Sequence, residues 1–151
     1  MMLPHRRPRA RGGAAVVCMI SLAAVASAGE EETRSLELGK AAYLQYCASC
    51  HGASGRGDGP VAASLATAPL DLTKIAARRD GEFPEGQIAE FIDGRRWVSA
   101  HGPREMPVWG EQFGEGTPGS VHHETAALGR ILLVVEYLRT IQDPPAKRPK
   151  R

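Results

Sequence analysis

The sequence predicts a small all-α domain of three to five short helices. A chain of 151 residues has room for one domain of modest size. Apolar residues recur at helical spacing in three stretches, at about residues 35–47, 84–94 and 124–141. No strand–helix–strand pattern surrounds the cysteines near the end of the first stretch. Each stretch is therefore interpreted as a helix.

The first helix is expected to begin at Ser35, a residue type suited to an N-cap. Leu36, Gly39, Tyr43 and Cys47 follow at helical spacing. This helix should therefore end at a cysteine.

The second helix is bounded by Pro84 and Gly94. Proline suits the first helical position, and glycine commonly ends a helix. Between them, Ile88, Phe91 and Ile92 are expected to form an apolar face.

The last helix covers about Glu124–Ile141 and contains the apolar block Ile131–Val135. A helix that is apolar on several sides should be largely buried. Arg130, Glu136 and Arg139 exclude a membrane span here.

The amino terminus has the pattern of a secretory signal peptide over residues 1–28. Four arginines precede the apolar run Ala14–Ala26, and the small residues Ala26–Ala28 follow as a cleavage site. The mature chain is then expected to start at Gly29. In the alternative, the run stays uncleaved as a short anchor, although it is shorter than the roughly 20 apolar residues of a full span.

The basic residues are concentrated at the two ends of the chain. Residues 1–28 carry four arginines and no acid, and the Pro-rich tail 144–151 carries four more basic residues. Residues 29–143, the expected domain, hold 11 basic and 17 acidic residues, a net charge of −6. A general basic patch for nucleic acid is therefore excluded, and the tail is expected to be disordered.

Residues 47–51 read Cys-Ala-Ser-Cys-His. C-x-x-C-H is the attachment sequence for covalent haem. Two thiols one helical turn apart can each add to a vinyl group on one edge of a porphyrin, and the adjacent histidine then faces the iron. Cys18 leaves with the leader, so Cys47 and Cys50 are the two cysteines of the expected mature chain.

Three other interpretations of this motif are less well supported. A thioredoxin-like redox pair would lie between a strand and a helix. A structural zinc site would need two further ligands at regular spacing, which His101, His122 and His123 do not supply. A chance match is disfavoured because both cysteines of the mature chain fall within the motif.

With these residues the chain resembles the mono-haem class I c-type cytochromes over residues 33–143. Cys47–Gly52 continues into the extension G-x-x-G-x-G-D-G-P, which ends at Pro60 and is common in bacterial members. Met106–Gly110 is similar to the family's methionine ligand loop, and Val135–Arg139 to its carboxy-terminal helix. The resemblance implies a small cytochrome c fold packed around one covalent haem c.

Met106 is expected to be the sixth iron ligand, opposite His51. It is the single methionine outside the leader, and it lies among prolines and glycines and not on an apolar helix face. His/Met ligation raises the reduction potential of haem iron, which suits electron transfer. His101 is the rival ligand, and the adjacent His122 and His123 look like loop residues.

The resemblance also implies roles around the ligands. Pro60 matches the family proline whose carbonyl accepts a hydrogen bond from the ligand histidine, which would orient His51. Gly39 and Tyr137 match the positions where the family's first and last helices cross, a small residue facing an aromatic one.

The haem propionates need hydrogen-bond donors, and four side chains lie close to Met106 in the sequence. Trp97 precedes Met106 by nine residues, where related cytochromes often have a propionate-bonding tryptophan. The other candidates are Arg95, Arg96 and Arg104. A solvated charged loop would explain these arginines equally well.

The sequence thus predicts an exported mono-haem cytochrome c that carries single electrons between larger redox proteins. With both axial positions filled, no substrate turnover is expected. Docking to a donor and an acceptor should be transient. The protein would be periplasmic in a Gram-negative bacterium, without a stable membrane span after leader cleavage.

Two alternatives remain. One is a haem c subunit held permanently in an oxidase or dehydrogenase complex. The other is a haem protein with an open sixth position that binds small ligands.

Overall fold

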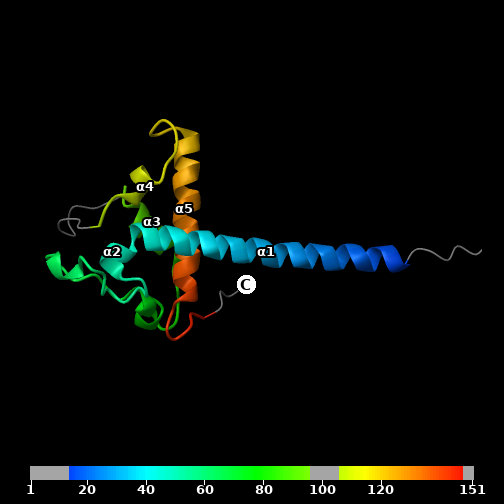
Figure 1. Ribbon diagram of the computed structural model, residues 1–151, viewed down its shortest axis with the longest axis horizontal. Coiled ribbons are helices and arrows are strands. Elements are labelled where there is room, and N and C mark those ends of the chain that lie inside the picture. The colour runs from blue at the N-terminus through cyan, green and yellow to red at the C-terminus, as the bar shows by residue number, and fades with distance from the viewer. Residues whose placement is uncertain (1–13, 96–105, 148–151) are drawn as a thin grey trace, which may run out of the picture. The chain divides into compact units, whose positions relative to one another are not determined.

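The computed structural model describes residues 14–95 and 106–147, with side chains from Gly29 onward. The regular structure of these residues is helical, and they contain no strand, which confirms the predicted all-α class (Figure 1). The chain divides into two compact units, residues 1–34 and 35–151. Within the described residues, no helix has both the length and the apolar composition that crossing a membrane requires.

Five α-helices and three short 3₁₀ helices are described. The α-helices are α1 (Ala14–Tyr46), α2 (Ala48–His51), α3 (Glu85–Asp93), α4 (Trp109–Gln112) and α5 (Val121–Thr140). The 3₁₀ helices are η1 (Ala62–Ser64), η2 (Leu72–Lys74) and η3 (Ala77–Arg79).

Helix α1 begins much earlier than the sequence predicted. Ser35 is not its N-cap, because the helix already runs from Ala14. No proline interrupts residues 14–46, and Glu30–Glu32 are good helix formers, so nothing in this part of the sequence stops the helix before Ser35. Its C-terminal end agrees with the prediction, since α1 stops at Tyr46 and Cys47 follows.

The part of α1 after Ser35 crosses α5 at Gly39 (Figure 1). A Cβ atom at Gly39 would overlap the backbone carbonyl oxygen of Leu133 and lie 3.2 Å from the Cβ of Tyr137. The expected pairing of Gly39 with Tyr137 is thereby confirmed. One turn later, the rings of Tyr43 and Tyr137 lie 5.2 Å apart between centroids. The two helices can approach closely because one of them lacks a side chain at the crossing.

Helix α3 begins one residue after Pro84 and ends at Gly94, which has the left-handed conformation. Ile88 and Ile92 are buried as predicted, but Phe91 is 66% exposed. The prediction for Phe91 was wrong because the buried face of α3 also includes Ala89, which shifts the centre of that face away from Phe91.

Helix α5 begins three residues before the predicted start. The Ser120 hydroxyl caps it by accepting a hydrogen bond from the backbone N–H of His123 at 3.2 Å. His122 and His123 therefore lie in the first turn of a helix. The prediction that they are loop residues was wrong. The Ile131–Val135 block is partly buried: Ile131, Val134 and Val135 belong to the core, whereas Leu132 is 47% exposed.

Candidate functional site

The cysteine motif lies on the short helix α2, directly after α1. Cys47 is the N-cap of α2, and its carbonyl accepts hydrogen bonds from the backbone N–H groups of Cys50 at 3.2 Å and His51 at 2.9 Å. Cys47 and Cys50 are both partly buried and do not form a disulfide. One helical turn therefore presents two thiols and an imidazole next to the core.

The glycine-rich loop after the motif folds back onto α2. Backbone N–H groups of Gly57, Gly59 and Val61 donate to the carbonyls of His51, Cys50 and Ser49, at 2.8, 3.2 and 3.1 Å respectively. A helix end leaves such carbonyls without partners inside the helix. The loop satisfies them and holds α2 in place.

Two glycines of this loop are required by its geometry. Gly52 has a φ of +78°, a backbone conformation that disfavours side chains. A Cβ atom at Gly59 would overlap the Ser49 carbonyl oxygen. These two glycines let the backbone turn tightly beside the motif.

His51 has the properties of an available metal ligand. Its Nδ1 atom is buried and has no hydrogen-bond partner within the described residues. Burial lowers the pKa of the His51 imidazole, and a hydrogen bond with the backbone of Leu70 opposes this shift. The ring is therefore neutral at physiological pH, which is the form that binds iron. Pro60 is exposed next to Gly59, and its predicted hydrogen bond with His51 stays a prediction.

The Cys47 thiol packs against the hydrophobic core. Burial, and to a smaller degree the neighbouring Cys50, raises the pKa of Cys47 from 9.0 to about 11. A thiol in an apolar environment retains its proton. Cys47 thus lies on the core side of α2, where an apolar group could pack against it.

Met106 packs against the same hydrophobic core as the motif. The core of buried side chains is bordered by Cys47, Ala48, Met106 and Trp109, each partly buried. Residues about 55 positions apart in the sequence, 47–51 and 106, therefore border one core. The role of Met106 as an iron ligand stays a prediction.

Three aromatic side chains connect the Met106 loop to the cysteine motif. Tyr46 precedes Cys47, and its ring lies 5.6 Å from that of Trp109 and 5.1 Å from that of Phe113 between centroids. The Trp109 and Phe113 rings are 5.1 Å apart. Edge-to-face and tilted aromatic pairs at these distances are favourable. This aromatic cluster (Tyr46, Trp109, Phe113) holds α4, which follows Met106, against the end of α1.

Trp109 belongs to the Met106–Gly110 segment, which is similar to the family's methionine ligand loop. Tyr46 and Phe113 were missed. The available signal was their position, since Tyr46 is adjacent to Cys47 and Phe113 is four residues after Trp109.

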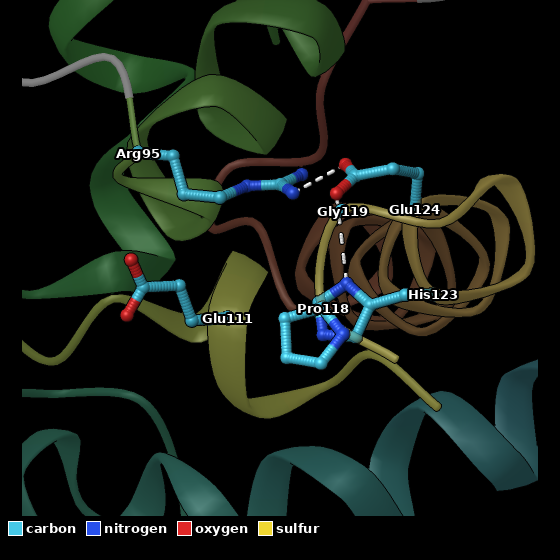
Figure 2. Close-up of a pocket in the computed structure, with 6 residues that line it drawn as sticks. All are labelled: Arg95, Glu111, Pro118, Gly119, His123 and Glu124. Atoms are coloured by element: carbon cyan, nitrogen blue, oxygen red, sulfur yellow. Dashed lines mark hydrogen bonds and ion pairs between the residues drawn. The ribbon is translucent and has the colours of Figure 1, made fainter. Parts of the chain in front are cut away.

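Arg95 is held in an ion-pair network at the end of α3 (Figure 2). Its guanidinium donates to both carboxylate oxygens of Asp93, at 2.8 and 2.7 Å, and to Glu124. These hydrogen bonds, first that with Asp93, hold the pKa of Arg95 above its ordinary value. Arg95 also borders a pocket of about 310 Å³, whose other lining residues include His123 and Glu111.

Of the four predicted propionate donors, one lies in the described part of the chain. Arg96, Trp97 and Arg104 lie outside the described residues, as does the rival ligand His101. The role predicted for Arg95 stays a prediction. In the described part of the chain, no group of three histidine, cysteine or carboxylate side chains could hold a metal ion.

The tail is partly described. The backbone N–H of Lys147 donates to the Gly81 carbonyl at 2.8 Å, so residues 144–147 return to the segment after η3. Residues 148–151 lie outside the described part.

A comparison with protein families matches residues 34–117 of the chain to the model described as cytochrome C oxidase, cbb3-type, subunit III. This region is more than half of the chain and includes the cysteine motif, Met106 and the aromatic cluster. Searches of curated proteins and of solved structures each found no significant match.

Proposed function

Because the chain belongs to the family of cytochrome c oxidase, cbb3-type, subunit III, we propose that it is an exported mono-haem cytochrome c that carries single electrons between larger redox proteins. Cytochrome c domains of this family carry covalently attached haem c, typically one per domain, and serve haem-based electron transfer. The carrier role, the ligands and the export are the parts that we propose.

The observation that carries the proposal is the construction of the motif. Two thiols and a neutral imidazole come from one turn of helix, and backbone hydrogen bonds from the glycine loop hold that turn. The buried Nδ1 of His51 has no hydrogen-bond partner in the described residues, so the ring keeps a nitrogen that these residues do not occupy. These features fit a covalently held haem.

We assign the residues as follows. Cys47 and Cys50 would hold the haem through thioether bonds, and His51 and Met106 would bind its iron. When bound, the haem iron supplies a one-electron couple between ferrous and ferric states. The chain's own contribution is to exclude water with its apolar core, to orient His51 through α2, and to hold the Met106 loop with the aromatic cluster.

Optical spectroscopy of purified holoprotein tests the ligation. The ferric wild-type protein should show the methionine–iron charge-transfer band, and the ferrous protein should not bind carbon monoxide. In Met106→Ala the band should disappear, carbon monoxide should bind, and the reduction potential should fall. Val108→Ala, a truncation in the same loop, should leave all three properties close to the wild type. If the wild-type ferrous protein binds carbon monoxide readily, the sixth position is open and the alternative with small ligands is supported.

The family description favours a second candidate, a haem subunit of an oxidase complex. Size-exclusion chromatography of mildly solubilised native membranes distinguishes the two. A free carrier should elute at the size of a single small domain. A persistent large complex that contains the chain would contradict the carrier and support the subunit.

A further inference from the structure

Tyr43 makes a hydrogen bond at each end of the Cys47–His51 motif. Its backbone carbonyl accepts from the N–H of Cys47 at 2.9 Å. Its side-chain hydroxyl donates to the carbonyl oxygen of Gly52 at 2.7 Å. The five residues of the motif are thus enclosed between two contacts of a single residue, which is fully buried.

The first of these bonds is an ordinary turn of α1, but the second is not. Gly52 ends α2 with φ +78° and ψ 154°, so its carbonyl points away from the helical direction. The N–H of Gly55 donates to the same oxygen at 3.1 Å. The hydroxyl of Tyr43 and the glycine loop therefore meet at one atom, the carbonyl oxygen of the residue that directly follows His51.

The position of the Tyr43 ring is determined by the crossing of α1 and α5. Its ring packs against that of Tyr137, and the absence of a side chain at Gly39 allows this approach. Burial raises the pKa of the Tyr43 hydroxyl well above its ordinary value, so the group stays a hydrogen-bond donor over the physiological range. The Tyr43 side chain thereby links the crossing of α1 and α5 to Gly52, the residue after His51.

We propose that Tyr43 is a positioning residue: its hydroxyl holds the Gly52 peptide and so sets the orientation of the His51 ring toward the haem iron. This inference rests on the proposed function, because it requires His51 to be an axial ligand. It assigns to Tyr43 no contact with the haem or the iron.

The test compares Tyr43→Phe with Tyr137→Phe in the purified holoprotein. Both variants remove one hydroxyl from the same ring pair, but only the first removes the bond to Gly52. In Tyr43→Phe, amide hydrogen exchange at Gly55 and Gly57 should accelerate roughly tenfold, which is the scale of one lost buried hydrogen bond. The g-value spread of the low-spin ferric haem should also change, since it depends on the orientation of the axial ligands. Tyr137→Phe should alter neither property.

Two results would overturn the proposal. One is a Tyr43→Phe holoprotein whose exchange rates and g values equal those of Tyr137→Phe. The other can be seen without any variant: the hydroxyl proton of Tyr43 should give a slowly exchanging proton resonance in the wild-type holoprotein, and rapid exchange with water would contradict the bond. Wild-type protein that carries no covalent haem would instead refute the proposed function, and the inference with it.

Discussion

Single polar side chains hold the loops that surround the motif. The carboxylate of Asp71 accepts hydrogen bonds from the backbone N–H of Thr73 at 2.8 Å and from its hydroxyl at 2.6 Å, and so caps η2. Thr73 is buried, and its carbonyl accepts from the N–H of Asp143 at 2.9 Å. The N–H of Leu72 donates to Gly55 at 2.7 Å, within the loop that supports α2. Asp71 thus holds η2, and η2 is bonded in turn to the loop at Gly55 and to the chain at Asp143.

This cap predicts a dependence of stability on pH. The hydrogen bonds from Thr73 hold the pKa of Asp71 below its ordinary value of 3.8. A lowered pKa means that the folded state favours the carboxylate, so the contribution is present above pH 3.8 and is lost as the pH falls through the lowered value. Asp71→Ala should reduce the free energy of unfolding at neutral pH by about 0.5–2 kcal/mol, the range for a lost cap.

Denaturant unfolding of the holoprotein between about pH 2 and pH 7 measures this effect. The difference between wild type and Asp71→Ala should shrink toward the acidic end, where Asp71 is protonated in both states. Glu90→Ala, which truncates an exposed acid on α3, serves as the control. A difference that is constant over the whole pH range would show that the carboxylate charge is not involved.

At the scale of elements, the crossing of α1 and α5 places the motif. The close approach at Gly39 puts Tyr43 against Tyr137, and the aromatic cluster joins α4 to the end of α1. Two segments distant in sequence, one with the motif and one with Met106, are brought to the same core by these contacts.

Two glycine-to-alanine substitutions should act in opposite directions. In Gly39→Ala, the new methyl group would overlap the backbone carbonyl of Leu133, which cannot move aside without shifting α5. We expect a loss of about 1–3 kcal/mol, as for an overpacked core. Gly129 also lies in a helix, but apart from its chain neighbours and the backbone of its own helix no atom lies within 4 Å of the position that its Cβ would occupy. Gly129→Ala should therefore stabilise the protein by up to about 1 kcal/mol.

Thermal and denaturant unfolding of both holoprotein variants checks this pair. The helix propensity gained is the same in the two substitutions, so the difference between them measures the crossing itself. Equal stabilisation by both would mean that the helices do not approach closely at Gly39.

At the scale of the whole molecule, the net charge would change with the proposed removal of residues 1–28. The four arginines of residues 1–28 leave with the proposed leader, and the expected domain 29–143 has a net charge of −6 before any haem propionates are counted. A partner that docks to this domain therefore need not be acidic, although the sequence as a whole has a net charge of +2.

The intact mass of the exported holoprotein tests the processing. It should equal the chain from Gly29 onward plus one haem, because cleavage follows Ala28 and both thiols add to haem vinyl groups without loss of atoms. A mass that retains residues 1–28 would contradict cleavage and support the short anchor. A mass without haem would contradict the attachment at Cys47 and Cys50.

The sequence by itself determined the features that depend on neighbouring residues. The C-x-x-C-H motif, the glycines after it, the bounds of α3 to within one residue and the end of α1 all follow from local spacing and backbone preference. Resemblance to a family added the pairing of Gly39 with Tyr137, which the structure confirms. The family of the chain and its all-α class could also be predicted from the sequence, because both follow from local motifs and helical spacing.

Only the tertiary structure decided the features that depend on packing between distant segments. The exposure of Phe91, the pairing of Arg95 with Glu124 and the bond from Tyr43 to Gly52 have no signature in spacing along the chain. Burial depends on which face of a helix meets its neighbour, and a hydrogen bond depends on where a second segment puts its acceptor. Both are set by the way α1, α3 and α5 pack, and so they emerge only when the chain is folded.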